Sequence, residues 1–125
     1  MAETKGTDRG PVLLIDDEPD TRYLISSVLR HEGYEVAEAS DRAEAIQFVS
    51  SRRPALVLLD WRLPGDSGDR VAEAIRTHHP DAGFVVVTAD GRASAKAEQI
   101  SAIGHLQKPF QVEELVEVVA EALAR

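Results

Sequence analysis

The side chains best suited to chemistry stand at the ends of short apolar runs. Asp16 and Asp17 follow the run Val12–Ile15, and Asp60 follows the run Leu56–Leu59. Carboxylates gathered at one place repel each other, by about 4 kcal/mol for a pair 4 Å apart at an effective dielectric constant near 20. A bound cation is the simplest remedy, and ligands that are all oxygens favour Mg²⁺ or Mn²⁺ over zinc.

The alternation of apolar runs with amphipathic segments predicts how these side chains meet. Each run is typical of a buried strand, and the carboxyl ends of parallel strands share one edge, where open α/β sheets place their sites. Five βα units in succession predict an α/β fold, with a parallel sheet covered by helices on both faces. The predicted strands are 12–15, 34–39, 56–59, 84–88 and 105–107, and the predicted helices are about 19–31, 41–51, 69–78, 93–102 and from 112 onward.

Two helices differ in the apolar side chains that they bring to the core. The last helix carries an apolar stripe, and we expect it to lie flat on the sheet. Its members are Val112, Leu115, Val116, Val119 and Leu123. The fourth helix offers mainly alanines and Ile100, so we expect it to bury little apolar area and to be the most mobile element.

Two further features complete a recognisable order of motifs. Thr88 ends another apolar run, and Lys108-Pro109-Phe110 comes late in the chain. Residues 60–68, Asp-Trp-Arg-Leu-Pro-Gly-Asp-Ser-Gly, match an Asp-x-x-Leu-Pro-x-x-x-Gly loop. Together these motifs resemble the receiver domain of bacterial response regulators, the CheY-like family of two-component signalling. The resemblance runs from about Pro11 to the C-terminus, and it implies a flavodoxin-like, doubly wound (βα)5 fold with strand order 2-1-3-4-5.

The resemblance assigns roles to the acidic residues. Asp60 would be the phosphoacceptor, attacking the phosphorus of a phosphohistidine or a small acyl phosphate to give an aspartyl phosphate. Asp17, Asp60 and the backbone carbonyl of Arg62 would ligate Mg²⁺ or Mn²⁺, and Asp16 would reach the metal through water. The domain would catalyse only its own phosphorylation and slow dephosphorylation.

The remaining site residues would stabilise and read the phosphoryl group. Lys108 would share with the metal the charge of the transferring group, and in the family a cis peptide bond to the proline, here Pro109, aims this lysine. Thr88 would donate its hydroxyl to a phosphate oxygen once the phosphoryl group is present. That contact would draw the end of its strand inward and reshape the face beyond it.

The sequence also departs from the family pattern. His105 stands where the family usually has Tyr or Phe, and it is either a pH-dependent part of the switch or simply a solvent-facing histidine. Thr88 and Lys108 are 108 − 88 = 20 positions apart, about two fewer than the family leads us to expect, and Ser101 stands where a helix-ending glycine is common. These changes fall on the usual signalling face and weaken the expectation of a symmetric dimer there, so we expect a monomer or a weak dimer.

Arg62 and Asp90 each lie two residues beyond a site residue. We expect them to pair across the mouth of the site, where they could obstruct hydrolysis of the acyl phosphate. Because the first helix should border the site, we expect its Asp20, Arg22 and Arg30 to contribute to the choice of kinase.

Three other interpretations remain. An aspartyl-nucleophile phosphatase needs a second Asp two residues after the first, where this chain has Arg62. A flavodoxin-like cofactor binder needs a Ser, Thr and Gly phosphate loop, where this chain has three acidic residues in 16–18. A degenerate receiver that binds partners without phosphorylation would have lost site residues that this chain retains.

The composition limits which classes of partner the chain is expected to bind. The 14 Lys and Arg residues against 22 Asp and Glu give a net charge of −8, which disfavours direct binding to nucleic acid. The chain has no cysteine and no apolar stretch of about 20 residues, so we expect no disulfide and no membrane span, and a cytoplasmic location.

Residues 1–10 read as a disordered leader or a cloning remnant, and residues 11–125 as the receiver. The expected partners are a histidine kinase or phosphotransfer protein, and a downstream protein or fused output domain.

Overall fold

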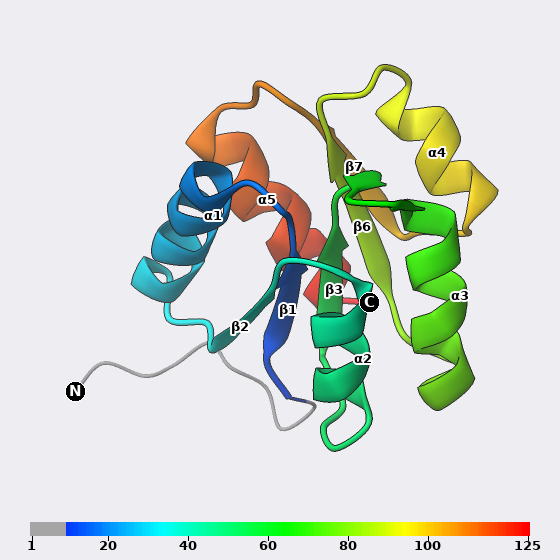
Figure 1. The fold of residues 1–125 in the computed structure, drawn as a ribbon. Helices are drawn as coiled ribbons and strands as arrows, with labels where there is room; N and C mark the ends of the chain where they lie inside the picture. Colours follow the sequence, from blue (N-terminus) through cyan, green and yellow to red (C-terminus); the bar gives the residue numbers. More distant parts are fainter. Residues whose placement is uncertain (1–9) are drawn as a thin grey trace.

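The computed structural model describes residues 10–125, so the predicted leader, except for Gly10, lies outside the described residues. A five-stranded parallel sheet forms the centre, in the order β2-β1-β3-β6-β7 (Figure 1). The strands of this sheet are β1 (Val12–Ile15), β2 (Val36–Ala39), β3 (Leu56–Leu59), β6 (Phe84–Thr88) and β7 (Gly104–Gln107). The helices are α1 (Pro19–His31), α2 (Arg42–Val49), α3 (Gly68–His78), α4 (Ala93–Gln99) and α5 (Val112–Leu123). A short hairpin, β4 (Arg62–Leu63) and β5 (Asp66–Ser67), follows β3.

The predicted fold and strand order are confirmed, since β6 and β7 are the fourth and fifth strands of the main sheet. The differences lie at element ends. The Tyr34 backbone N–H still bonds to the Leu29 carbonyl in the turn that ends α1, so β2 begins only at Val36. Asp41 caps α2, with its side chain accepting a hydrogen bond from the Glu44 backbone N–H, so the helix starts one residue later than predicted. The β4–β5 hairpin was not predicted.

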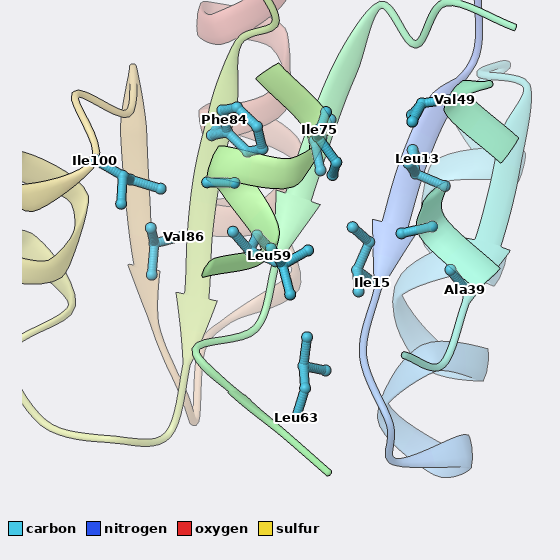
Figure 2. Close-up of a cluster of buried hydrophobic side chains, with 14 of the residues drawn as sticks. Leu13, Ile15, Ala39, Val49, Leu59, Leu63, Ile75, Phe84, Val86 and Ile100 are labelled. Carbon is cyan, nitrogen blue, oxygen red and sulfur yellow. The ribbon is translucent and has the colours of Figure 1, made fainter. Parts of the chain in front are cut away.

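Two hydrophobic layers hold the sheet between its helices. Successive strand residues point to opposite faces, so Leu13 and Ile15 pack under α2 and α3, while Val12 and Leu14 pack under α1 and α5. Figure 2 shows the first layer, in which Phe84, Val86 and Ile100 continue the core towards α4. In the same view Leu63 lies just past the end of β3. The central strands are therefore fixed from both sides, which holds the loops at their carboxyl ends in place.

The helix expectations need one correction. In α5, Leu115, Val119 and Ala122 are buried in the core, and Val118 and Leu123 pack against it partly buried. Val112, which begins the helix, is instead 43% exposed. In α4, Ala93 and Ala97 are buried, as is Ile100 just after the helix. These side chains are small or few, so the expected modest burial is found, and the mobility of α4 stays a prediction.

Candidate functional site

Two neighbouring strands bring the predicted acidic residues to one edge of the sheet. Asp16 and Asp17 follow β1, and Asp60 follows β3, which pairs directly with β1. One carboxylate oxygen from each of the three aspartates lies within 4.8 Å of the other two. Asp16 and Asp60 are buried, whereas Asp17 is exposed. The cluster that the sequence predicted therefore forms, with one member open to solvent.

Lys108 reaches this cluster from the end of β7. Its Nζ donates to Asp16 Oδ2 at 2.8 Å and to Asp60 Oδ2 at 3.1 Å. Burial opposes the charged ammonium, but these two carboxylates outweigh it, and the pKa of Lys108 is raised. The predicted cis peptide bond between Lys108 and Pro109 is present. The lysine is a fixed positive charge beside the predicted nucleophile.

Burial dominates the electrostatics of Asp60. It raises the pKa of this carboxyl, and repulsion from Asp16 raises it further, against the lowering effects of Lys108 and of the Arg62 backbone N–H. That N–H donates to Asp60 Oδ1 at 3.3 Å, and the Glu18 backbone N–H donates to Asp16 Oδ1 at 2.9 Å. Three carboxylates and one ammonium sum to −3 + 1 = −2, a charge that one divalent cation balances. Carboxylate oxygens within 4.8 Å of each other, one of them exposed, fit a hydrated Mg²⁺ or Mn²⁺.

A cavity of about 370 Å³ opens over the cluster. At roughly 30 Å³ per water molecule, this volume admits a phosphoryl group together with a hydrated ion. Its lining brings together most of the predicted residues with several that the sequence analysis did not select. The lining residues are Asp17, Glu18, Asp60, Arg62, Leu63, Pro64, Thr88, Ala89, Asp90 and Lys108.

Thr88 is fully buried at the end of β6, with its hydroxyl already engaged. Its Oγ1 accepts a hydrogen bond from the Asp90 backbone N–H at 3.1 Å. Asp90 in turn accepts from Arg62 at 3.4 Å and pairs with Lys96 at 3.6 Å. The hydrogen bond from Arg62 is the main reason that the pKa of Asp90 is lowered. The predicted Arg62–Asp90 pair is present, and Lys96, which the sequence analysis did not select, joins it.

Comparison with known proteins places this geometry in a family. The family model for the response regulator receiver domain matches residues 12–120. The chain belongs to the response regulator receiver family. Sporulation initiation phosphotransferase F of Bacillus subtilis is 29% identical over 114 residues, which cover 90% of this chain and 92% of that protein. The phosphate regulon transcriptional regulatory protein PhoB of Pseudomonas aeruginosa is 34% identical over 118 residues, which cover 91% of this chain but only 52% of that protein.

Solved structures agree with this assignment. The receiver domain of NtrX from Brucella abortus superimposes with a TM-score of 0.83 at 32% identity, covering 90% of this chain and 98% of that one. A CheY-like receiver domain protein from Methanospirillum hungatei has a TM-score of 0.84 at 25% identity, covering 92% and 94%. The chain thus spans nearly all of these two receiver domains and about half or less of longer relatives.

The hairpin after Asp60 shapes one wall of the receiver site. Asp66 is only 7% exposed at its side chain and pairs with Arg42 of α2 at 2.9 Å, which ties the hairpin to that helix. A Cβ atom at Gly68 would lie 2.7 Å from Cε3 of Trp61, so the ring packs where only glycine leaves room. The Asp-x-x-Leu-Pro-x-x-x-Gly match included Gly68, but the pattern alone did not indicate its contact with Trp61.

The residues that depart from the family pattern have defined positions. His105 is exposed on β7, beside a groove that four glutamates of α5 also line. Ser101 adopts a φ of 54°, the left-handed conformation that glycine favours, and this ends α4 before the predicted Ala102. Both interpretations of His105 stay predictions.

The prediction that Asp20, Arg22 and Arg30 of α1 border the site is wrong for Arg30. Arg30 lies in the last turn of the helix and donates to the Val36 carbonyl at the start of β2, at the opposite end of the sheet. Arg22 does lie near the site, but its guanidinium makes two intramolecular contacts. It donates a hydrogen bond to the Asp16 carbonyl at 2.8 Å, and it forms a salt bridge with Glu38. Asp20 is exposed.

In residues 10–125, no helix is long and apolar enough to cross a membrane.

Proposed function

We propose that this chain is a cytoplasmic phosphoacceptor receiver that takes a phosphoryl group onto Asp60 in a Mg²⁺-dependent reaction. The observation that carries the proposal is the convergence of the Asp16, Asp17 and Asp60 oxygens within 4.8 Å, with the Lys108 ammonium 3.1 Å from the Asp60 carboxylate. A phosphohistidine of a histidine kinase or of a phosphotransfer protein would be the donor. The chain catalyses only its own phosphorylation and slow dephosphorylation.

The reaction is an in-line displacement at phosphorus. An oxygen of the Asp60 carboxylate forms the new O–P bond while the P–N bond to the donor imidazole breaks, and the imidazole leaves with the bond's electron pair. A bound Mg²⁺, held by Asp17, Asp60 and the Arg62 carbonyl, with Asp16 acting through water, would neutralise charge on the phosphoryl oxygens. Lys108 already contacts Asp60 and needs little reorganisation to contact the phosphoryl group.

Thr88 supplies the switch. Its Oγ1 accepts from the Asp90 N–H, so its hydroxyl hydrogen is available for a phosphoryl oxygen on Asp60. Turning towards the phosphoryl group weakens the bond to Asp90 and shifts the β6–α4 loop, residues 89–92. A downstream protein, or an output domain elsewhere in a longer chain, would bind the face that this shift alters. We expect His105, which is exposed on the neighbouring strand, to take part in this change.

The Arg62–Asp90 pair sets the lifetime of the acyl phosphate in this proposal. Both residues line the cavity over Asp60, and Lys96 also pairs with Asp90. Water must cross this mouth to attack the phosphorus. We expect Arg62→Ala and Asp90→Ala to accelerate dephosphorylation, and an unchanged rate would contradict this role.

The test is the intact mass of the protein after incubation with Mg²⁺ and acetyl phosphate. One metal-dependent phosphoryl group is expected on the wild type, and none in chelator or in Asp60→Asn. Asp81→Asn is the matched control, because Asp81 is an exposed aspartate that pairs with Arg53 and does not line the cavity. Trp61, the only tryptophan and the neighbour of Asp60, offers a fluorescence measure of Mg²⁺ binding in the same samples. A folded protein that binds Mg²⁺ but takes up no phosphoryl group would favour the phosphorylation-independent interaction module instead.

A further inference from the structure

We infer that Gln107 is a positioning residue that couples the end of β6, where Thr88 lies, to the start of α4. This inference rests on the proposed function, because it concerns how phosphorylation of Asp60 is transmitted. Gln107 precedes Lys108 on β7 and pairs in register with Thr88 of β6. Its side chain is part of no step in the phosphoryl transfer.

The Gln107 side chain spans the β6–α4 loop. Its Nε2 lies 3.1 Å from the Thr88 carbonyl and 3.4 Å from the Asp90 carbonyl, and its Oε1 accepts from the Ala93 backbone N–H at 3.3 Å. A single planar amide therefore contacts backbone groups at both ends of the loop. The orientation is fixed by chemistry, because a flipped amide would set its NH₂ against the Ala93 N–H and its oxygen against carbonyls.

The contact with Ala93 replaces a missing cap. Arg92, at the N-cap position of α4, has a φ of 68° and makes no side-chain capping hydrogen bond. A helix start leaves backbone N–H groups without partners inside the helix, and α4 has only seven residues to hold it together. Gln107 supplies the acceptor from a neighbouring strand, so the position of the α4 N-terminus depends on a side chain outside the helix.

The contact with Thr88 completes the coupling. The Thr88 carbonyl accepts both from the Lys108 backbone N–H at 2.9 Å and from the Gln107 amide. When Thr88 turns towards a phosphoryl group, a shift of its backbone moves the amide plane and hence the acceptor offered to Ala93. The α4 N-terminus then responds to the state of Asp60 without any contact to the phosphoryl group itself.

Two variants separate the two halves of this coupling. Gln107→Met keeps the length of the side chain and removes both donor and acceptor. Gln107→Glu keeps an acceptor for Ala93 but loses the donor to Thr88 and places a carboxylate against carbonyls. Gln47→Met is the matched control, because Gln47 is an exposed glutamine on α2. All the variants change exposed side chains, so the fold should tolerate them.

The experiment is amide hydrogen exchange at α4, with intact mass recorded for each sample. Without phosphoryl donor, we expect exchange in residues 93–96 to be about fivefold faster in Gln107→Met, the effect of losing roughly one net hydrogen bond. Gln107→Glu should stay near the wild type there. With Mg²⁺ and acetyl phosphate, both Gln107 variants should take up the phosphoryl group as the wild type does, but the change in α4 exchange should fall by at least half.

The outcomes distinguish this inference from the proposed function. Normal uptake with an undiminished α4 response in both Gln107 variants would overturn the coupling. If the wild type takes up no phosphoryl group, the proposed function fails. The comparison without donor then still decides the capping contact, because unchanged exchange in Gln107→Met would overturn it.

Discussion

Arg76 of α3 anchors the C-terminal end of α4, and removing its side chain should destabilise the domain measurably. Its guanidinium donates to the Ile100 carbonyl at 2.6 Å and lies 4.7 Å from the centre of the Phe84 ring. Because Arg76 is only half-buried, we take the low end of the usual energies for these two interactions. These are about 1.5 kcal/mol for a hydrogen bond from a charged group and about 0.5 kcal/mol for a cation–π contact. Arg76→Ala should therefore lower the free energy of unfolding by about 2 kcal/mol.

Urea unfolding followed by circular dichroism measures this effect, and the melting temperature should fall by roughly 6–10 °C for a domain of this size. Arg70→Ala is the matched control, because Arg70 is an exposed arginine on the same helix, and its loss should cost less than about 0.5 kcal/mol. Arg76→Lys should fall between the two, since lysine keeps a charged donor but loses the planar group that stacks on Phe84. If Arg76→Ala costs no more than Arg70→Ala, the anchoring argument is refuted.

Three further predictions use the same unfolding measurement. Ser101→Gly should stabilise the domain by about 0.5–1 kcal/mol, because relief of the left-handed backbone exceeds the added chain entropy of glycine, and a lower urea midpoint would count against this. Gly68→Ala should cost about 1–3 kcal/mol and alter Trp61 fluorescence, because the new methyl group meets the ring, whereas an unchanged midpoint would show that the ring moves aside freely. Asp60→Asn in chelator should be more stable than the wild type at pH 7. The pKa of Asp60 is raised in the folded protein, so its ionisation destabilises the fold as the pH rises from the ordinary carboxyl pKa of about 3.9 through the folded value. The advantage of the variant should vanish below the ordinary value, and a variant less stable than the wild type at pH 7 would contradict the sign.

The sequence was sufficient for the parts of the site that backbone topology fixes. Asp16, Asp60 and Thr88 come directly after apolar runs, and parallel pairing brings the ends of those runs together whatever the loops do. The pairing of Arg62 with Asp90 was likewise predictable from their equal offsets from two such ends. The β4–β5 hairpin was not, because two-residue strands have no periodicity to detect.

Contacts made by long side chains also could not be predicted from the sequence. The position of Arg30 on α1 predicts that it lies at the surface, but nothing in its spacing indicates that it bonds to the start of β2. Gln107 and Arg76 belong to elements that contact α4 only after the chain has folded, and each bonds across 14 or more positions in the sequence. Such contacts depend on rotamers and on the distances between packed elements, which residue type and periodicity do not determine.

The helix with the weakest sequence signal is thus the one whose position depends most on other elements. α4 has seven residues and no side-chain cap from its own N-cap residue, and a left-handed Ser101 lies just past its C-terminal end. Helices this short are marginal in isolation, so α4 draws its stability from Ala93, Ala97 and Ile100 in the core and from Gln107 and Arg76 at its two ends. Of these anchors, Gln107 also donates a hydrogen bond to the carbonyl of Thr88, the residue that reads Asp60 in the proposed function. A signal from the phosphorylation site should therefore reach α4 at its N-terminus, while Arg76 holds the other end in place.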